Sequence, residues 1–125
     1  MFNKGGKKYP GAAEVPPGWY GAMCQGQAIS VLVRAHLATR HLATSHLASG
    51  RSNNYLAAAA RAAAVFNMSS QEGGVRGEVL GRVWYEEYPT SPSSHILNGF
   101  IYGLLGLQEL ASVQGAGGAA EQLYR

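Results

Sequence analysis

The segment Trp84–Ser94 reads WYEEYPTSPSS and leads directly into an apolar stretch, His95–Leu110. It places three aromatic rings, two carboxylates and two prolines within eleven residues. Phenols and carboxylates on a proline-stiffened lead-in are typical of proton-transfer and sugar-binding sites rather than of a hydrophobic core. A second block of the same character lies upstream, where Pro16–Ser30 reads PPGWYGAMCQGQAIS. These two blocks indicate both the fold and the place of a site.

Apolar residues around these blocks recur at helical spacing. We expect a first helix over Gly21–Ser49 that ends at Gly50, and a second over Asn53–Met68 that is capped by Asn53 or Asn54. The buried face predicted for the second helix comprises Tyr55, Ala59, Ala62 and Phe66.

The second half of the chain predicts a hairpin and two further helices. Val75–Leu80 and Arg82–Tyr85 flank a turn near Gly81 and read as two short strands. A third helix is expected over Ser94–Leu110, capped by Ser93 or Ser94. A fourth is expected from Ala119, after a linker of Gly115 to Gly118. The apolar stripe predicted for the third helix comprises Ile96, Leu97, Phe100, Ile101, Leu104 and Leu107.

The composition is that of one small globular domain. Of the 125 residues, 46% are hydrophobic and 14% charged, which separates the chain from disordered sequences. The net charge of +3 is compatible with an acidic polysaccharide partner and equally with an ordinary solvated surface; we expect no nucleic-acid partner. A single cysteine, Cys24, excludes an internal disulfide, and we expect its thiol to be buried. No signal peptide and no membrane-spanning run are expected.

Three histidines recur in a short repeat, at His36, His41 and His46. A step of five residues turns an α-helix by about 140°, so the three rings would point in different directions. Zinc pairs on helices instead use spacings of three or four residues. The repeat therefore predicts a low-complexity lengthening of a helix, and we expect no metal site.

The two blocks resemble the C-terminal catalytic domain of heparan sulfate D-glucuronyl C5-epimerases. In that family a PGWYSAMAQGQAIS segment precedes a helix, and WYEEYPTTPSS is followed by LNGF, which stands here at Leu97–Phe100. The resemblance covers most of Pro17–Leu110, with a divergent middle. We therefore expect a loop or disordered lead-in over residues 1–16 and a partial epimerase C-terminal domain over residues 17–125.

The resemblance implies an all-α fold, namely a partial α/α toroid with a short β-hairpin. It implies an isomerase that epimerises C5 of D-glucuronate to L-iduronate in N-sulfated heparosan during heparan sulfate and heparin biosynthesis. It implies no cofactor, the precursor polysaccharide as partner, a homodimer of the full-length protein and a place on the lumenal side of the Golgi membrane. A non-catalytic helical module that binds acidic polysaccharide is the alternative, followed by an unrelated helical-repeat interaction protein.

The resemblance also implies roles for individual residues. Tyr88 matches a tyrosine that the family uses in proton transfer, and Glu87 matches the acidic active-site residue before it. Neighbours on an extended strand point to opposite faces, so the two need a bend in order to share a site. The alternative for Tyr88 is a half-buried phenol bonded to backbone. The expected substrate-binding residues are Trp19, Tyr20, Gln25, Gln27, Glu86 and Asn98; for the first four, a role at the entry of a helix is the alternative.

Two family segments that carry further tyrosines and an arginine, similar to TIYDLRH and WDYHTTH, have no counterpart here. The resemblance therefore implies that the isolated chain is inactive and folds poorly. We expect it to associate through an exposed stripe of Phe100, Leu104 and Leu107.

Overall fold

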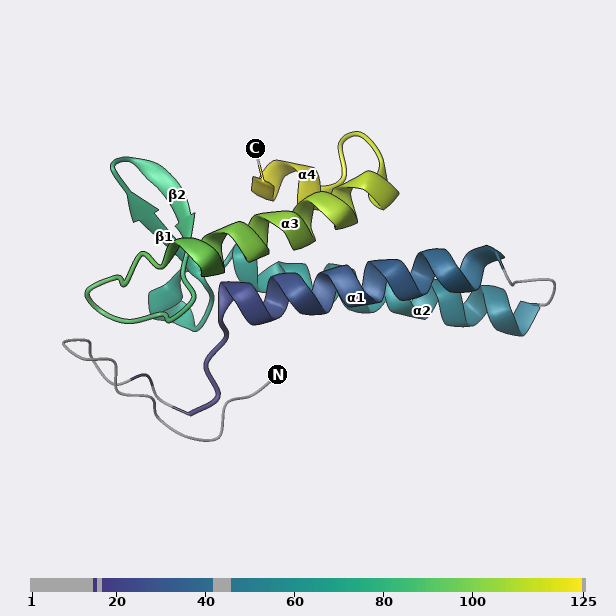
Figure 1. Ribbon diagram of the computed structural model, residues 1–125, viewed down its shortest axis with the longest axis horizontal. Coiled ribbons are helices and arrows are strands. Elements are labelled where there is room, and N and C mark those ends of the chain that lie inside the picture. The colour runs from purple at the N-terminus through teal and green to yellow at the C-terminus, as the bar shows by residue number, and fades with distance from the viewer. Residues whose placement is uncertain (1–14, 16, 42–45, 125) are drawn as a thin grey trace.

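The structure is a computed structural model that describes residues 15, 17–41 and 46–124. Long helices lie side by side, and a two-stranded hairpin stands at one end (Figure 1). A mainly helical fold with one short hairpin is thus confirmed for the described residues. No helix in this part of the chain has the length and apolarity needed to cross a bilayer. The elements are α1 (Ala22–His41), α2 (His46–Ala63), η1 (Ala64–Phe66), η2 (Ser70–Glu72), β1 (Arg76–Val79), β2 (Arg82–Tyr85), α3 (Leu97–Gln114) and α4 (Ala119–Tyr124).

The expected single helix over Gly21–Ser49 is wrong. α1 ends at His41 and α2 begins at His46, so Gly50 and Asn53 lie inside α2 and neither ends nor caps a helix. The two helices are joined by hydrogen bonds: the Nδ1 atom of His36 lies 2.9 Å from the Ser52 carbonyl oxygen, and the Ser52 hydroxyl donates to the His36 carbonyl at 3.0 Å.

Of the three repeat histidines, His36 is therefore a buried residue that joins α1 to α2. The side chains of the other two lie outside the described residues. Among the side chains that are described, no three His, Cys, Asp or Glu gather as metal ligands would.

The buried face of α3 differs from the expected stripe. Leu97 and Ile101 are 60% and 45% exposed, whereas Leu107 is fully buried. The residues of α3 that face the core are Gly99, Gly103, Gly106, Leu107, Leu110 and Ala111. The expectation failed because it assumed that the large apolar side chains of α3 face the core. α3 instead contacts α1 through glycines, which allow the two helix backbones to approach closely.

The contact between α1 and α3 depends on glycines of both helices. A Cβ on Gly106 would lie 2.3 Å from the Gly26 carbonyl oxygen, and a Cβ on Gly26 would lie 2.1 Å from the Tyr102 carbonyl oxygen. The two helices run in the same direction, and α2 runs opposite to them (Figure 1). The N-terminal ends of α1 and α3 therefore meet at the end of the molecule that carries the hairpin.

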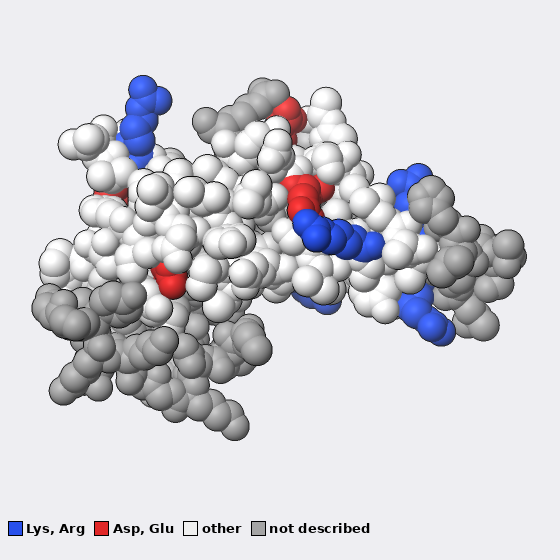
Figure 2. Space-filling model, in the orientation of Figure 1, with Lys and Arg blue, Asp and Glu red and all other residues white. Residues whose placement is uncertain are grey.

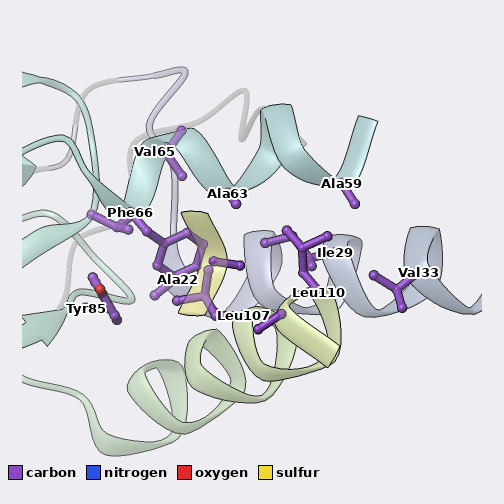
Figure 3. Packing of buried hydrophobic residues seen from close by; sticks show 13 residues of the cluster. Ala22, Ile29, Val33, Ala59, Ala63, Val65, Phe66, Tyr85, Leu107 and Leu110 are labelled. Atoms are coloured by element: carbon purple, nitrogen blue, oxygen red, sulfur yellow. The ribbon is translucent and has the colours of Figure 1, made fainter. Parts of the chain in front are cut away.

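The core lies between these helices and the hairpin (Figure 3). Phe66 and Leu107 are fully buried, and Phe66 packs edge-on against Tyr85 with ring centroids 4.9 Å apart. The predicted core face of α2 and η1 is confirmed, with Tyr55 and Ala62 half-buried at its margin. Phe100 and Leu104 pack against this cluster. The exposed stripe on which self-association was expected to rest is therefore absent from the described surface.

Two further expectations concern single residues. Cys24 is exposed rather than buried, because it lies on the outer side of α1. Neither Ser93 nor Ser94 caps α3: the N-cap residue is Ile96, without a side-chain hydrogen bond.

The expected hairpin is confirmed, with Arg76 paired to Tyr85 and Val79 to Arg82. Its two loop residues, Leu80 and Gly81, both have positive φ, as a type I′ turn requires.

Charges do not gather on the face shown in Figure 2, where Lys, Arg, Asp and Glu side chains are few and scattered. One ion pair, 2.7 Å between Arg34 and Glu109, bridges α1 and α3 at the surface. Exposed pairs of this kind contribute little to stability. The net charge of +3 therefore forms no basic patch on this face.

The Tyr85 phenol should make stability depend on alkaline pH. Its hydroxyl donates to the Leu123 carbonyl, and burial raises the pKa of Tyr85, an effect that nearby Arg76 partly opposes. A pKa raised in the folded state gives stability that is present below the unfolded value, near 10, and is lost as pH rises through the folded pKa. In urea unfolding, wild type should exceed Tyr85→Phe in stability at pH 8, and the gap should shrink towards pH 11. A gap that stays constant would contradict this assignment.

Candidate active site

The two sequence blocks meet where the chain leaves β2. The Glu86 amide donates to the Val75 carbonyl at 2.7 Å, and the Glu86 carbonyl accepts from the Ala22 amide, the first of α1, at 2.9 Å. The chain then carries Glu87 and Tyr88 across the N-terminal ends of α1 and α3. The two blocks, far apart in the sequence, thus lie side by side in the structure.

Glu87 is buried between the starts of two helices, with 7% of its surface exposed. A Cβ on Gly99 would lie 2.4 Å from the Glu87 Cβ, and a Cβ on Gly21 would lie 2.6 Å from the Glu87 carbonyl oxygen. Glycine at the start of each helix therefore makes room for the glutamate. The N-terminal ends of helices favour a negative charge, and neither helix has an acidic residue in its own first turn.

The carboxylate of Glu87 has an open acceptor. Its Oε2 atom is buried and has no hydrogen-bond partner among the described residues. Buried carboxylate oxygens are normally hydrogen-bonded, and unsatisfied ones concentrate at functional sites. Glu87 therefore has an acceptor that no described residue uses, and a ligand would reach this buried atom only if the loop around it opened.

Tyr88 lies against Trp19 of the upstream block. Its ring and that of Trp19 have centroids 5.1 Å apart at an interplanar angle of 46°. The Trp19 Nε1 atom is buried without a hydrogen-bond partner among the described residues. A pocket of about 640 Å³ lies beside Trp19 and is lined by Trp19, Tyr20, Pro89 and Thr90 among others, but not by Glu87 or Tyr88. An aromatic wall with polar atoms nearby is typical of carbohydrate-sized ligand sites.

Glu86 points the other way, into the protein, and is 0% exposed. Its Oε2 atom accepts from the Ser94 hydroxyl and from the His95 amide, each at 3.1 Å. Its Oε1 atom lies 3.6 Å from His95 Nε2. Each glutamate keeps one buried oxygen without a hydrogen-bond partner among the described residues, Oε1 of Glu86 and Oε2 of Glu87. The two differ in their surroundings: Glu86 is bound by Ser94 and His95 at the end of the loop, whereas Glu87 lies between the starts of α1 and α3.

A sequence profile of the family described as D-glucuronyl C5-epimerase C-terminus matches residues 3–125. The chain belongs to this epimerase family. A D-glucuronyl C5-epimerase of Caenorhabditis elegans is 47% identical to it over 100 residues, which are 80% of the chain. The chain spans about 14% of the length of that relative.

The other residues predicted for the epimerase site are distributed over three places. Tyr20 lines the same pocket as Trp19. Gln25 is 5% exposed within α1, whereas Gln27 is exposed and faces a separate hollow between α1 and α3. Asn98 is exposed in the first turn of α3. The structure therefore groups Trp19 and Tyr20 with the Glu86–Tyr88 segment and leaves Gln27 apart.

Sequence reasoning missed four residues of this epimerase segment. Gly21 and Gly99 make room for Glu87, while Ser94 and His95 hold Glu86. A signal for the two glycines was present in the sequence. Each stands at the start of a helix, where glycine adds neither apolar surface nor a side-chain cap, so its presence indicates that another group approaches closely. No pattern in the sequence marks Ser94 as the partner of Glu86, since the contact depends on how the loop closes.

Proposed function

We propose that this chain supplies one proton-transfer face of a C5-epimerase that converts D-glucuronate to L-iduronate in N-sulfated heparosan. Glu87 carries the proposal: it is a buried carboxylate with an open oxygen, placed beside Tyr88 between two helix starts, in a chain of this family. The reaction belongs to heparan sulfate and heparin biosynthesis.

The chemistry explains why such a residue is needed. The C5 hydrogen lies next to the sugar carboxylate, and its removal leaves the C–H electron pair delocalised into that carboxylate. One group must take the proton from one face of the ring, and another must return a proton to the opposite face. Either Glu87 or Tyr88 transfers the proton on one face of the ring, and the other of the two residues shapes the electrostatic field around it. The helix N-termini behind them favour the negative charge that builds up on the substrate.

The same proposal covers the setting of the enzyme. α1 and α3 run parallel to each other and α2 runs antiparallel to both. This alternation supports a place in the α/α toroid of a longer protein. We propose that this protein acts in the Golgi lumen, as a homodimer and without a cofactor, on the precursor polysaccharide. Trp19 and Tyr20 would stack on sugar faces, and the exposed Gln27 and Asn98 would bind hydroxyl groups where the toroid brings them to the polysaccharide. Gln25 is buried within α1, which favours its alternative role at the entry of the helix.

The test places the segment in a whole enzyme. Residues 84–107 replace the matching segment of the Caenorhabditis elegans relative, and deuterium uptake at C5 of glucuronate in N-sulfated heparosan is measured in D₂O. We expect uptake within about tenfold of the parent, because substitutions outside the reacting groups leave most of the transition-state stabilisation intact. A folded graft that binds the polysaccharide without exchange would favour the non-catalytic alternative and overturn the proposal.

A further inference from the structure

The loop that carries Glu87 and Tyr88 is closed by a small polar cluster, which we call the Glu86 bracket: Glu86, Ser94 and His95. Glu86 stands at the start of the loop, and the other two stand at its end. The Glu86 Oε2 atom accepts both the Ser94 hydroxyl and the His95 amide at 3.1 Å. A fully buried carboxylate therefore joins the two ends of the segment.

The bracket reaches the backbone of Tyr88 directly. The Ser94 hydroxyl also lies 3.1 Å from the Tyr88 carbonyl oxygen, which accepts the Thr90 amide as well at 2.8 Å. A serine hydroxyl has one proton, so Ser94 shares it between the carboxylate and the carbonyl. Ser94 thereby fixes the position of the peptide that follows Tyr88 relative to Glu86.

His95 completes the bracket on the outer side. Its φ of 47° lies in the left-handed region, which is uncommon for a residue other than glycine and turns its amide towards Glu86. Its Nε2 atom lies 3.1 Å from the Glu78 carbonyl oxygen of β1 and 3.6 Å from Glu86 Oε1. The ring also stands edge-on to Trp84, whose own ring stacks on Phe100 with centroids 4.3 Å apart.

We propose that Glu86 and Ser94 are positioning residues for Glu87 and Tyr88 rather than groups that touch the sugar. The inference rests on the proposed function for its catalytic consequence, but the geometry of the loop is independent of it. A carboxylate with 0% exposure cannot contact a substrate unless the loop opens, whereas its two hydrogen bonds hold that loop shut. Burying a carboxyl group is costly unless it is hydrogen-bonded, and here two donors from the end of the loop, the Ser94 hydroxyl and the His95 amide, bind it.

The first measurement uses the full 125-residue chain and records amide hydrogen exchange at Thr90 together with thermal unfolding. Ser94→Ala should speed exchange at Thr90 by about tenfold or more while the unfolding midpoint stays within a few degrees, because the lost bonds are local. Ser94→Thr, which keeps the hydroxyl, should restore slow exchange. Ser93→Ala is the matched control, since Ser93 is the neighbour of Ser94 in the sequence and its own hydroxyl makes no hydrogen bond within the described residues.

The second measurement uses the whole epimerase that carries residues 84–107. Ser94→Ala and Glu86→Gln should each lower kcat by about tenfold or more with KM within twofold, as expected when only transition-state geometry is disturbed. An unchanged kcat in both variants would overturn the positioning role, whether or not exchange at Thr90 changes. If Glu87→Gln is also fully active, the proposed function fails instead, and the exchange data alone then decide whether the bracket orders the loop.

Discussion

Glu87→Gln in the grafted epimerase is expected to lower the rate of C5 deuterium uptake by about a hundredfold or more, the usual effect of losing a positioned acid or base. The amide has nearly the shape of the carboxylate but can no longer accept a proton at Oε2, the atom left open in the structure. Tyr88→Phe should cause a loss of the same order, since it removes only the hydroxyl and keeps the ring against Trp19.

Two controls separate chemistry from folding in that experiment. Tyr102→Phe removes an exposed phenol from α3 within the same segment and should leave the rate unchanged. Thermal unfolding of all variants should agree within a few degrees. Full activity of Glu87→Gln would show that the base is another residue, and full activity of Tyr88→Phe would exclude that hydroxyl from proton transfer.

Gly106→Ala should destabilise the chain by about 3 kcal/mol, the upper part of the range for overpacked cores. The added methyl group would lie 2.3 Å from the carbonyl oxygen of Gly26, and backbone cannot move aside as a side-chain end can. The variant thus reverses the usual order of helix propensities, in which alanine is more favourable than glycine.

Gly50→Ala in α2 is the matched control for this prediction. Apart from the adjoining turns of α2 itself, no atom of the described residues lies within 4 Å of the site where its methyl group would stand, so the substitution should stabilise the chain by roughly 0.5–1 kcal/mol. Denaturant unfolding of both variants measures the two free energies. Equal effects of the two substitutions would show that α1 and α3 are further apart than the structure places them.

Local patterns were sufficient for the hairpin and for the approximate place of each later helix. The hairpin was predictable because Gly81 stands between two short segments that contain valine, and a turn with positive φ favours glycine. The end of α1 was not predictable, since the repeat continues through His41 and His46 without a glycine or proline that would end a helix. The buried face of α3 was missed because periodicity counts large apolar residues, whereas Gly103 and Gly106 form the contact.

The candidate site was predictable to a similar degree. Motif resemblance pointed to Glu87 and Tyr88, and the structure brings both to the starts of α1 and α3. The different placement of Glu86 could not be read from the sequence, because two adjacent glutamates are chemically identical until the chain turns. Only the folded loop gives Glu86 the Ser94 hydroxyl and places Glu87 between the starts of two helices.

The two tryptophans of the chain both border the loop, one against Tyr88 and the other stacked on Phe100. Intrinsic fluorescence should therefore report the state of this small region, whereas far-UV circular dichroism reports the helices, which contain no tryptophan. A state in which the loop opens while the helices remain intact would change the emission spectrum and leave the dichroism unchanged. The protein thus contains its own optical probe, placed where the chemistry is proposed to occur.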